Sequence, residues 1–225
     1  MSKERMNKNI IAVAASFLLT LSTTALADVS STVNLASDYT FNGYSQTDSG
    51  PALQASLDYA ADSGFYTGTW ASNLDFSPAD DTNLEWDFYA GQYFQVNDKV
   101  GLDTGIAYYT YHGADASDTY NYPEAYAKFG YSSSMGNSEL NFWYSWDYFG
   151  VGTGHYIAMV AHTFEVASGH NIKVTFDRST STDKAKWAWD EAGNDAYNHY
   201  RVEYMTSWKG FDFDLALEDT SLDID

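Results

Sequence analysis

The sequence has no cysteine, only three prolines and few basic residues. Without cysteine, a disulfide framework, a thiolate metal site and a cysteine nucleophile are excluded. The 11 Lys and Arg residues stand against 31 Asp and Glu residues, which gives a formal net charge of -20. We therefore expect no nucleic-acid partner, because phosphate repulsion would meet no basic face.

Long apolar runs are also scarce, since none after the first 27 residues approaches the roughly 20 residues of a membrane-spanning helix. Aromatic residues are abundant, at 17% of the chain with 19 Tyr and 7 Trp. Disordered acidic tails are poor in aromatic residues, so this composition indicates an ordered fold. The length suits one domain, or two at most.

The first segment has the three parts of a secretory signal peptide. Lys3, Arg5 and Lys8 precede an apolar run, Ile10–Leu21, and the segment ends in Ala-Leu-Ala at Ala25–Ala27. The alternative, an N-terminal membrane anchor, requires a longer apolar run. The sequence predicts a cleaved signal peptide at residues 1–27 and a barrel domain at residues 28–225.

The mature chain alternates between apolar and polar residues with a period of two. One segment, for example, places Leu84 and Trp86 in one phase and Glu85 and Asp87 in the other. This period is typical of strands with two different faces. We count eleven such segments, the first of which is expected to run to Phe41.

The connections between these segments alternate between long and short. The segment Gly150–Gly154 is an apparent exception among the longer ones. Outer-membrane barrels have long loops on one side and short turns on the other, with aromatic residues at both membrane interfaces. Aromatic residues near the segment ends are Tyr39, Trp70, Trp86, Tyr108, Tyr144, Trp146 and Trp208.

The predicted fold is all-β, an antiparallel up-and-down transmembrane β-barrel of about 12 strands in the outer membrane. Single-chain bacterial barrels have even strand numbers, so eleven strands leave an open edge. We expect either that the last strand is missing by truncation or that the chain closes in another way.

Two blocks near the start of the mature chain carry a family resemblance. The first reads SDYTFNGYSQ at Ser37–Gln46, followed by PALQ at Pro51–Gln54; the second reads DSGFY at Asp62–Tyr66, followed by Gly68, Trp70, Ser72 and Asn73. Both are similar to the TorF family of porins, also called the Gcw_chp group. The resemblance covers about the first quarter of the mature chain and implies a Gram-negative outer-membrane barrel.

Two positions depart from the family pattern. Asn42 stands where the family commonly has Arg, and the chain stops at Asp225 before the last strand and terminal aromatic residue expected of such barrels. The barrel-assembly machinery, an expected partner, recognises that terminal strand. Outer-membrane lipid and lipopolysaccharide are the other expected surroundings; the oligomeric state stays open.

If the apolar phases face lipid, the opposite phases face the lumen. The predicted lumen-lining residues are Asp38, Asp58, Glu85, Asp87, Asp103, Glu124, Lys128, Asp147, Lys173, Asp177, Arg201, Glu203, Asp212 and Asp214. Rings of carboxylates select for cations. We therefore expect a porin-like channel for small solutes that prefers cations. A filled interior, in which these groups bond with tyrosines and the few cations, is an equal alternative.

Acidic loops raise the possibility of a Ca²⁺ site, at Asp75, Asp80 and Asp81 or at Asp115 and Asp118. No twelve-residue Ca²⁺-binding loop is present, so solvated acidic loops are the favoured interpretation, and no metal or cofactor is expected.

An enzyme is not expected either, because the five histidines show no H-E-x-x-H spacing and no G-x-S-x-G elbow occurs. A barrel lipid hydrolase that uses Ser145 and His162 is unfavourable because the two residues have opposite phases. The remaining alternatives are a structural or surface-interaction barrel and a secreted soluble β-sandwich.

Overall fold

The computed structural model describes residues 10–20, 27–76 and 80–222. Its long strands are β1 (Ile10–Thr20), β2 (Ala27–Ala36), β5 (Ala52–Ala61), β6 (Phe65–Asn73), β7 (Leu84–Asn97), β8 (Val100–His112), β9 (Tyr122–Ser133), β10 (Gly136–Ser145), β11 (His155–Ala167), β12 (His170–Ser181), β13 (Ala196–Trp208) and β14 (Phe211–Thr220). The connections hold the short strands β3 (Thr40–Phe41) and β4 (Tyr44–Ser45) and the 3-10 helices η1 (Ser117–Tyr120) and η2 (Tyr148–Gly150). Among the described residues, no helix has the length and apolar character needed to cross a membrane.

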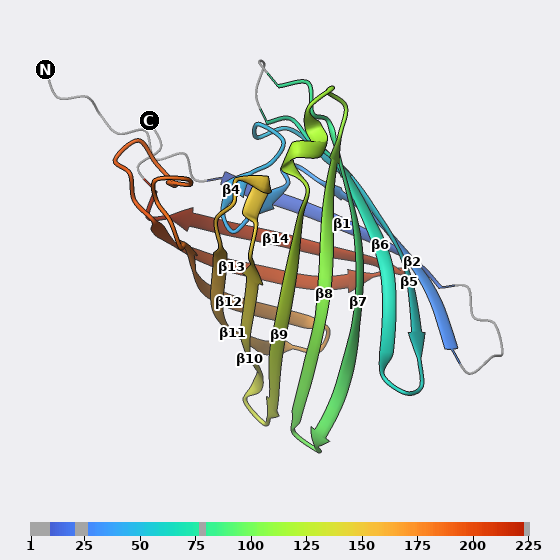
Figure 1. The fold of residues 1–225 in the computed structure, drawn as a ribbon. Helices are drawn as coiled ribbons and strands as arrows, with labels where there is room; N and C mark the ends of the chain where they lie inside the picture. The colour runs from blue at the N-terminus through green and yellow to red at the C-terminus, as the bar shows by residue number, and fades with distance from the viewer. Residues whose placement is uncertain (1–9, 21–26, 77–79, 223–225) are drawn as a thin grey trace, which may run out of the picture.

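Eleven of the long strands, β2 and β5 to β14, form one antiparallel up-and-down sheet (Figure 1). Each of these strands pairs with the next one along the chain, as Thr69 of β6 does with Phe88 of β7. The predicted fold class and the count of eleven strands are confirmed. Every second connection has only two or three residues, so it sets the register of its hairpin locally.

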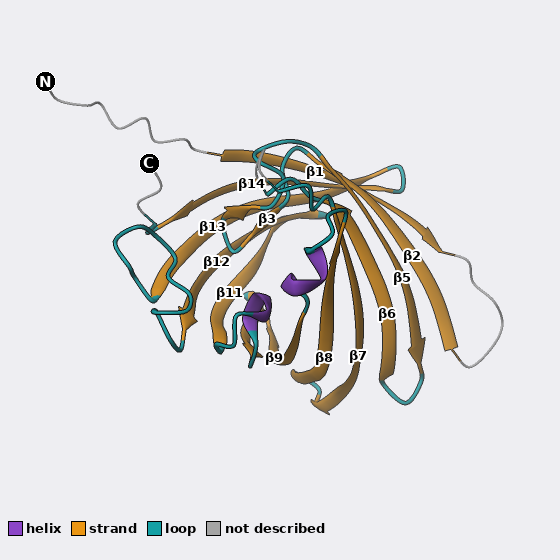
Figure 2. Ribbon diagram, turned by 45° about the horizontal axis from the view of Figure 1, so that its top comes forward, coloured by secondary structure: helices purple, strands orange, loops and turns teal. Residues whose placement is uncertain are grey.

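The eleven-stranded sheet is open between β2 and β14, and β1 occupies that space (Figure 2). β1 runs antiparallel to both neighbours, with Ala15 opposite Leu35 of β2 and Phe213 of β14. Together the twelve strands form a closed barrel. β1 is the apolar run of the predicted signal peptide, whose residues 1–9 and 21–26 lie outside the described part of the chain.

The connections differ in length at the two ends of the barrel. The long-loop end carries residues 37–51, 74–76, 80–83, 113–121, 146–154 and 182–195, and the turn end carries residues 62–64, 98–99, 134–135, 168–169 and 209–210. The predicted exception at Gly150–Gly154 is therefore wrong. β10 ends at Ser145, and the connection that follows is long and contains η2.

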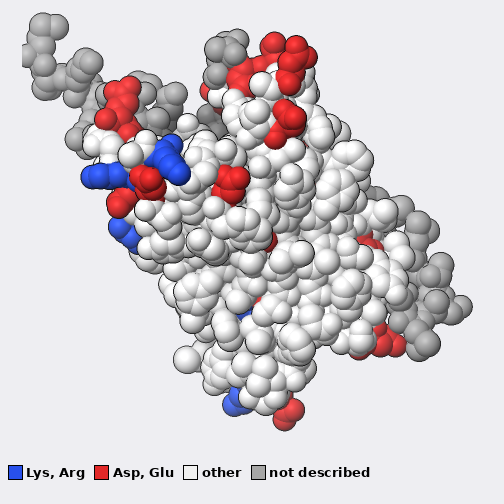
Figure 3. Space-filling view, viewed as in Figure 1, with Lys and Arg blue, Asp and Glu red and all other residues white. Residues whose placement is uncertain are grey.

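Side chains alternate between an apolar outer face and a polar inner face. On β13, Tyr200, Val202 and Tyr204 point outward and are exposed, whereas Tyr197 and His199 point inward and are buried. Figure 3 shows the same division from outside, because charged side chains gather mainly at the ends and leave a wide uncharged zone over the strands.

Two details of the first strands differ from prediction. β2 ends at Ala36, so Tyr39 and Phe41 lie in the next connection and do not continue its apolar face. Trp70 of β6 points inward, and its ring packs edge-on against Tyr39 with centroids 5.4 Å apart. These two rings therefore do not belong to an outer aromatic girdle. Trp86, Tyr108, Tyr144, Trp146 and Trp208 are exposed.

Candidate functional site

Hydrogen bonds that skip a strand identify the interior face of the barrel. Tyr66 of β6 donates to Asp103 of β8 at 2.5 Å, across the width of β7. Lys173 of β12 forms an ion pair with Glu139 of β10, with 2.6 Å between Nζ and Oε1. Neighbouring strands lie about 4.8 Å apart, so such contacts form most readily where a curved sheet brings its side chains together.

The structure places most of the predicted lumen residues on this interior phase of their strands. They are Asp58, Glu85, Asp87, Asp103, Glu124, Lys128, Lys173, Asp177, Arg201, Glu203, Asp212 and Asp214. Two others lie in connections, where strand alternation does not apply. Asp38 follows β2 and accepts hydrogen bonds from Ser45 at 2.6 Å and Thr47 at 2.9 Å. Asp147 follows β10 and accepts from the backbone N–H of Gly152.

Three interior residues that make strong contacts are not among the predicted lumen-lining residues. Glu139 pairs with Lys173, and Glu218 accepts hydrogen bonds from His199 and Arg201 at 3.1 Å each. The period-two signal places Glu139 in phase with the inward residues of β10 and Glu218 in phase with those of β14. The same period places His199 in phase with Arg201 on β13, but it does not identify the partners of His199, which come from two other strands.

An ionic network lines the wall made by β12, β13 and β14. Asp177 lies 2.6 Å from His199 Nδ1, and Glu218 lies 3.1 Å from His199 Nε2. Arg201 contacts Glu218 at 3.1 Å and Glu203 at 2.6 Å. The network places a carboxylate beside each ring nitrogen of His199 and pairs Arg201 with two glutamates.

The first long connection, residues 37–51, makes hydrogen bonds to this network. Thr40 donates to Glu218 at 2.7 Å, and the Asn42 amide donates to Asp177 at 2.9 Å. In return, the Tyr197 hydroxyl donates to the backbone carbonyl of Asn42 at 3.1 Å. The β3–β4 hairpin is thereby held against the inner wall of the barrel at the long-loop end.

Aromatic side chains fill the same end, and we call this group the aromatic cap. All five long connections contribute to it, and its members are Tyr39, Phe76, Tyr120, Tyr148, Phe149, Trp187 and Trp189. They pack on the buried strand residues Tyr111 and Tyr122. The Phe149 ring lies at the centre, 5.2 Å from Tyr111, 5.3 Å from Tyr122 and 5.4 Å from Trp187 between centroids.

Three carboxylates are buried among the tyrosines on which this cap rests. Glu85 and Asp87 of β7 and Glu124 of β9 are exposed by only 3%, 7% and 1%. Tyr111 donates to Glu85 at 3.0 Å and Tyr109 to Glu124 at 2.8 Å, yet each carboxylate keeps one oxygen without a partner. Within the described residues no ion pair reaches them, so their charge is neutralised by protons or by a cation from outside the chain.

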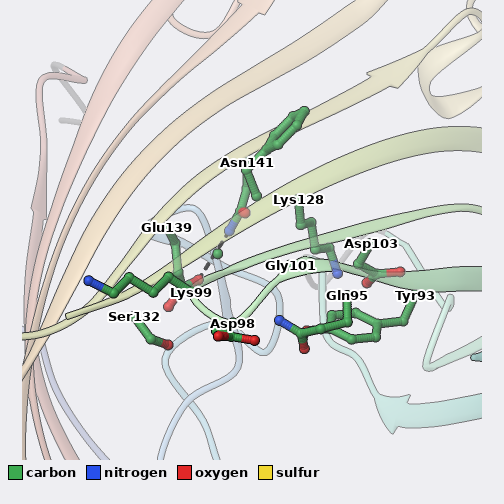
Figure 4. A pocket seen from close by; sticks show the side chains of 12 residues that line it. Tyr93, Gln95, Asp98, Lys99, Gly101, Asp103, Lys128, Ser132, Glu139 and Asn141 are labelled. Atoms are coloured by element: carbon green, nitrogen blue, oxygen red, sulfur yellow. Dashed lines mark hydrogen bonds between the residues drawn. The ribbon is translucent and has the colours of Figure 1, made fainter.

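The turn end is open by contrast, and it contains a cavity of about 330 Å³ (Figure 4). We call it the turn-end cavity, and its walls come from β7, β8, β9 and β10 and from the β7–β8 turn. Gly101 and Gly130 stand opposite each other on β8 and β9, so neither of these two positions projects a side chain of its own. A Cβ on Gly130 would meet no atom within 4 Å, whereas the Tyr93 ring lies over Gly101.

Acidic residues of the long loops are held by local hydrogen bonds. The backbone N–H of Thr82 donates to Asp80 Oδ1 at 2.9 Å, and the Tyr120 hydroxyl donates to Asp80 Oδ2 at 2.8 Å. These donors, Thr82 first, lower the pKa of Asp80 below its usual value. In the parts of the chain that the structure describes, no group of three or more His, Asp or Glu side chains is arranged to hold a metal ion.

Ser145 and His162 lie on opposite faces of the barrel. Ser145 is fully buried on the inner face and is paired in register with His155. The His162 ring lies on the outer face, where its Nδ1 is 2.9 Å from Ser138 Oγ and its Nε2 is 3.1 Å from the Met135 carbonyl. The two residues do not form a catalytic pair.

Residues 22–210 match a family described as a bacterial protein of unknown function, Gcw_chp. The chain belongs to the Gcw_chp family. The match confirms the Gcw_chp part of the resemblance seen in the first two blocks and extends it over most of the chain. No curated protein sequence matches this member of the family.

Solved structures with a similar fold include outer-membrane proteins. OccAB4 of Acinetobacter baumannii is 10% identical with a TM-score of 0.41, over 86% of this chain and 62% of that one. OprD of Pseudomonas aeruginosa is 11% identical with a TM-score of 0.41, over 85% and 65%. A bacterial polysaccharide outer membrane secretin is 10% identical with a TM-score of 0.41, over 94% and 98%.

This Gcw_chp chain therefore spans less than two thirds of the OccAB4 and OprD chains. The fold assignment depends on the strand order and register described above.

Proposed function

We propose that this Gcw_chp protein is an outer-membrane β-barrel that lets small solutes cross and favours cations. The observation that carries the proposal is the outer face, where large apolar side chains are exposed on strand after strand. Leu53, Ile106 and Leu217 are exposed by 56%, 61% and 53%. Soluble monomers rarely expose continuous apolar patches beyond a few hundred Å², so lipid is the natural surrounding of this surface.

The signal-peptide pattern in the first segment of the chain supports export to the outer membrane. In this proposal residues 1–27 are a cleaved signal peptide, and residues 28–225 form the barrel domain. Cleavage would remove β1 and leave β2 and β14 as edges that run in the same direction, separated by the width of one strand. From the family resemblance we also expect contact with lipopolysaccharide, assembly by the barrel-assembly machinery and a role like that of the TorF porins.

A preference for cations follows from the charge of the interior. Carboxylates outnumber Lys and Arg on the inward phases, and Arg201 and Lys173 are already paired with Glu203, Glu218 and Glu139. An acidic lining raises the local concentration of cations and repels anions.

The aromatic cap supports a second candidate, a barrel with a structural or surface role and no open channel. Its rings come from all five long connections and pack tightly over the inner wall. If the cap never opens, solutes enter the turn end and go no further.

Planar-bilayer recording of the full-length protein separates the two candidates. We expect discrete conductance steps above the lipid background and a reversal potential of cation-selective sign in a KCl gradient. Asp214→Asn, on the inner face of β14, is expected to reduce the selectivity, whereas Asp219→Asn, an exposed residue on the outer phase of the same strand, leaves it unchanged. Absence of any steps would refute the channel and favour the structural barrel.

A further inference from the structure

The turn-end cavity holds two opposite charges that face each other without pairing. Asp103 of β8 and Lys128 of β9 are directly opposite in register, where side chains of opposite charge normally attract. Among the described residues no ion pair joins them. Both line the cavity, and Figure 4 shows the two side chains near each other at its wall.

Each of the two charged groups instead contacts an aromatic side chain. Lys128 Nζ lies 4.5 Å from the centre of the Tyr126 ring and 5.7 Å from that of Trp143, which is cation–π geometry. Asp103 Oδ1 accepts from the Tyr66 hydroxyl at 2.5 Å, and Oδ2 makes no hydrogen bond with any described residue. The ammonium group and one carboxylate oxygen are therefore fixed in place and available.

The surrounding wall gives a ligand room at this point. Gly130 is next in phase to Lys128 on β9 and projects no side chain, and the cavity measures about 330 Å³. Pockets for small ligands begin at about this size. Asn141 and Ser132 add polar groups to the rim, and Glu139 is occupied by Lys173.

We propose that the turn-end cavity binds a small zwitterion, an α-amino acid, with its ammonium group on Asp103 and its carboxylate on Lys128. A zwitterion carries both charges within a few bonds of each other, and cross-strand partners such as Asp103 and Lys128 lie about 5 Å apart between Cα atoms, so one small molecule can contact both. A simple cation or anion satisfies only one of the two. The inference builds on the proposed function, since it names a solute class for the same interior.

The test compares three ligands of similar size that differ in charge. The full chain, recovered folded in detergent, is titrated calorimetrically with L-alanine, with L-alaninamide, which is only a cation, and with propionate, which is only an anion. We expect L-alanine to bind at least about tenfold more tightly than either, because each of the others lacks one charge-assisted contact. Equal binding of all three, or no binding of L-alanine, would overturn the proposal.

Two substitutions test which charged group of the ligand contacts Asp103 and which contacts Lys128. Asp103→Asn is expected to weaken the binding of L-alanine and of L-alaninamide about tenfold and to leave the binding of propionate unchanged. Lys128→Met is expected to weaken L-alanine and propionate and to leave L-alaninamide unchanged. A general structural defect would weaken the binding of every ligand alike. Loss of binding only for the ligands that carry the matching charge therefore indicates direct contact with the substituted residue. Loss of all three ligands in both variants would count against the site.

A third substitution tests the cavity without removing a charge. Gly130→Trp places a large ring in the open space and is expected to abolish L-alanine binding, because a Cβ at this position would meet no atom within 4 Å. Leu140→Trp is the matched control, since Leu140 lies on the outer face of the neighbouring strand. L-Alanine binding that survives Gly130→Trp in the folded protein would show that the ligand sits elsewhere.

Liposome swelling separates this proposal from the channel itself. Binding of L-alanine without swelling would leave the site standing and refute passage. Swelling by L-alanine that Asp103→Asn, Lys128→Met and Gly130→Trp leave unchanged would leave the channel standing and refute the site.

Discussion

Val202→Arg is expected to prevent stable insertion of the barrel into lipid. Val202 lies at the middle of β13, points outward and is 48% exposed. Its partners in register, Val174 and Leu217, are apolar and exposed as well. An arginine on the lipid face at mid-bilayer costs about 2–4 kcal/mol, a large part of the stability of a typical domain.

The measurement for Val202→Arg is the folded fraction in vesicles, followed by the heat-dependent shift in gel mobility and by urea titration. Met135→Arg is the control, because this residue is 74% exposed in the β9–β10 turn, outside the spanning strands. We expect the control to match the unmodified protein. If Val202→Arg folds as well as the control, water covers the outer face and the membrane assignment is wrong, because exposed surface substitutions usually change stability by less than about 0.5 kcal/mol.

Phe149→Gly is expected to open the aromatic cap and raise the conductance several-fold. The Phe149 ring contacts rings from three other long connections, those of Phe76, Tyr120 and Trp187, and from the strands β8 and β9. Its backbone has a φ of 49°, a conformation that glycine adopts at no steric cost. The substitution therefore removes the ring without adding backbone strain, and the cap loses its centre.

Single-channel recording measures the effect of Phe149→Gly, and uptake of a large hydrophilic antibiotic by intact cells provides a second readout. Phe142→Ala removes a ring of the same size from the outer face of β10 and is expected to leave conductance unchanged. An equal conductance in Phe149→Gly and the unmodified protein would show that the cap does not restrict passage.

Most of the interior residues were predictable because a strand alternates its faces with a period of two. Once Leu84 and Trp86 are assigned outward, Glu85 and Asp87 must point inward, and the structure places them there. The same rule fails where a strand ends. Asp38 and Asp147 were given a phase, but β2 stops at Ala36 and β10 at Ser145. A strand ends where the following connection leaves the sheet. The alternation of apolar and polar residues does not indicate that position.

The contacts across the barrel were beyond sequence reasoning. Thr40 meets Glu218 although 178 residues separate them, and Tyr39 turns its ring to Trp70 inside the barrel. The Thr40–Glu218 contact forms only when closure of the barrel brings its first and last strands together, and the Tyr39–Trp70 contact forms only when the first long connection folds into the barrel. The same holds for the cap, whose rings come from five connections spread along the chain.

The sequence by itself determined the all-β class, the eleven strands and the face of most residues, because each of these follows from local periodicity and the lengths of connections. The tertiary structure alone decided which end of the barrel is filled, which carboxylates lack a partner and where a cavity remains. It also placed β1 between β2 and β14. These features depend on the curvature of the sheet and on side chains from distant strands, and no stretch of sequence carries that information alone.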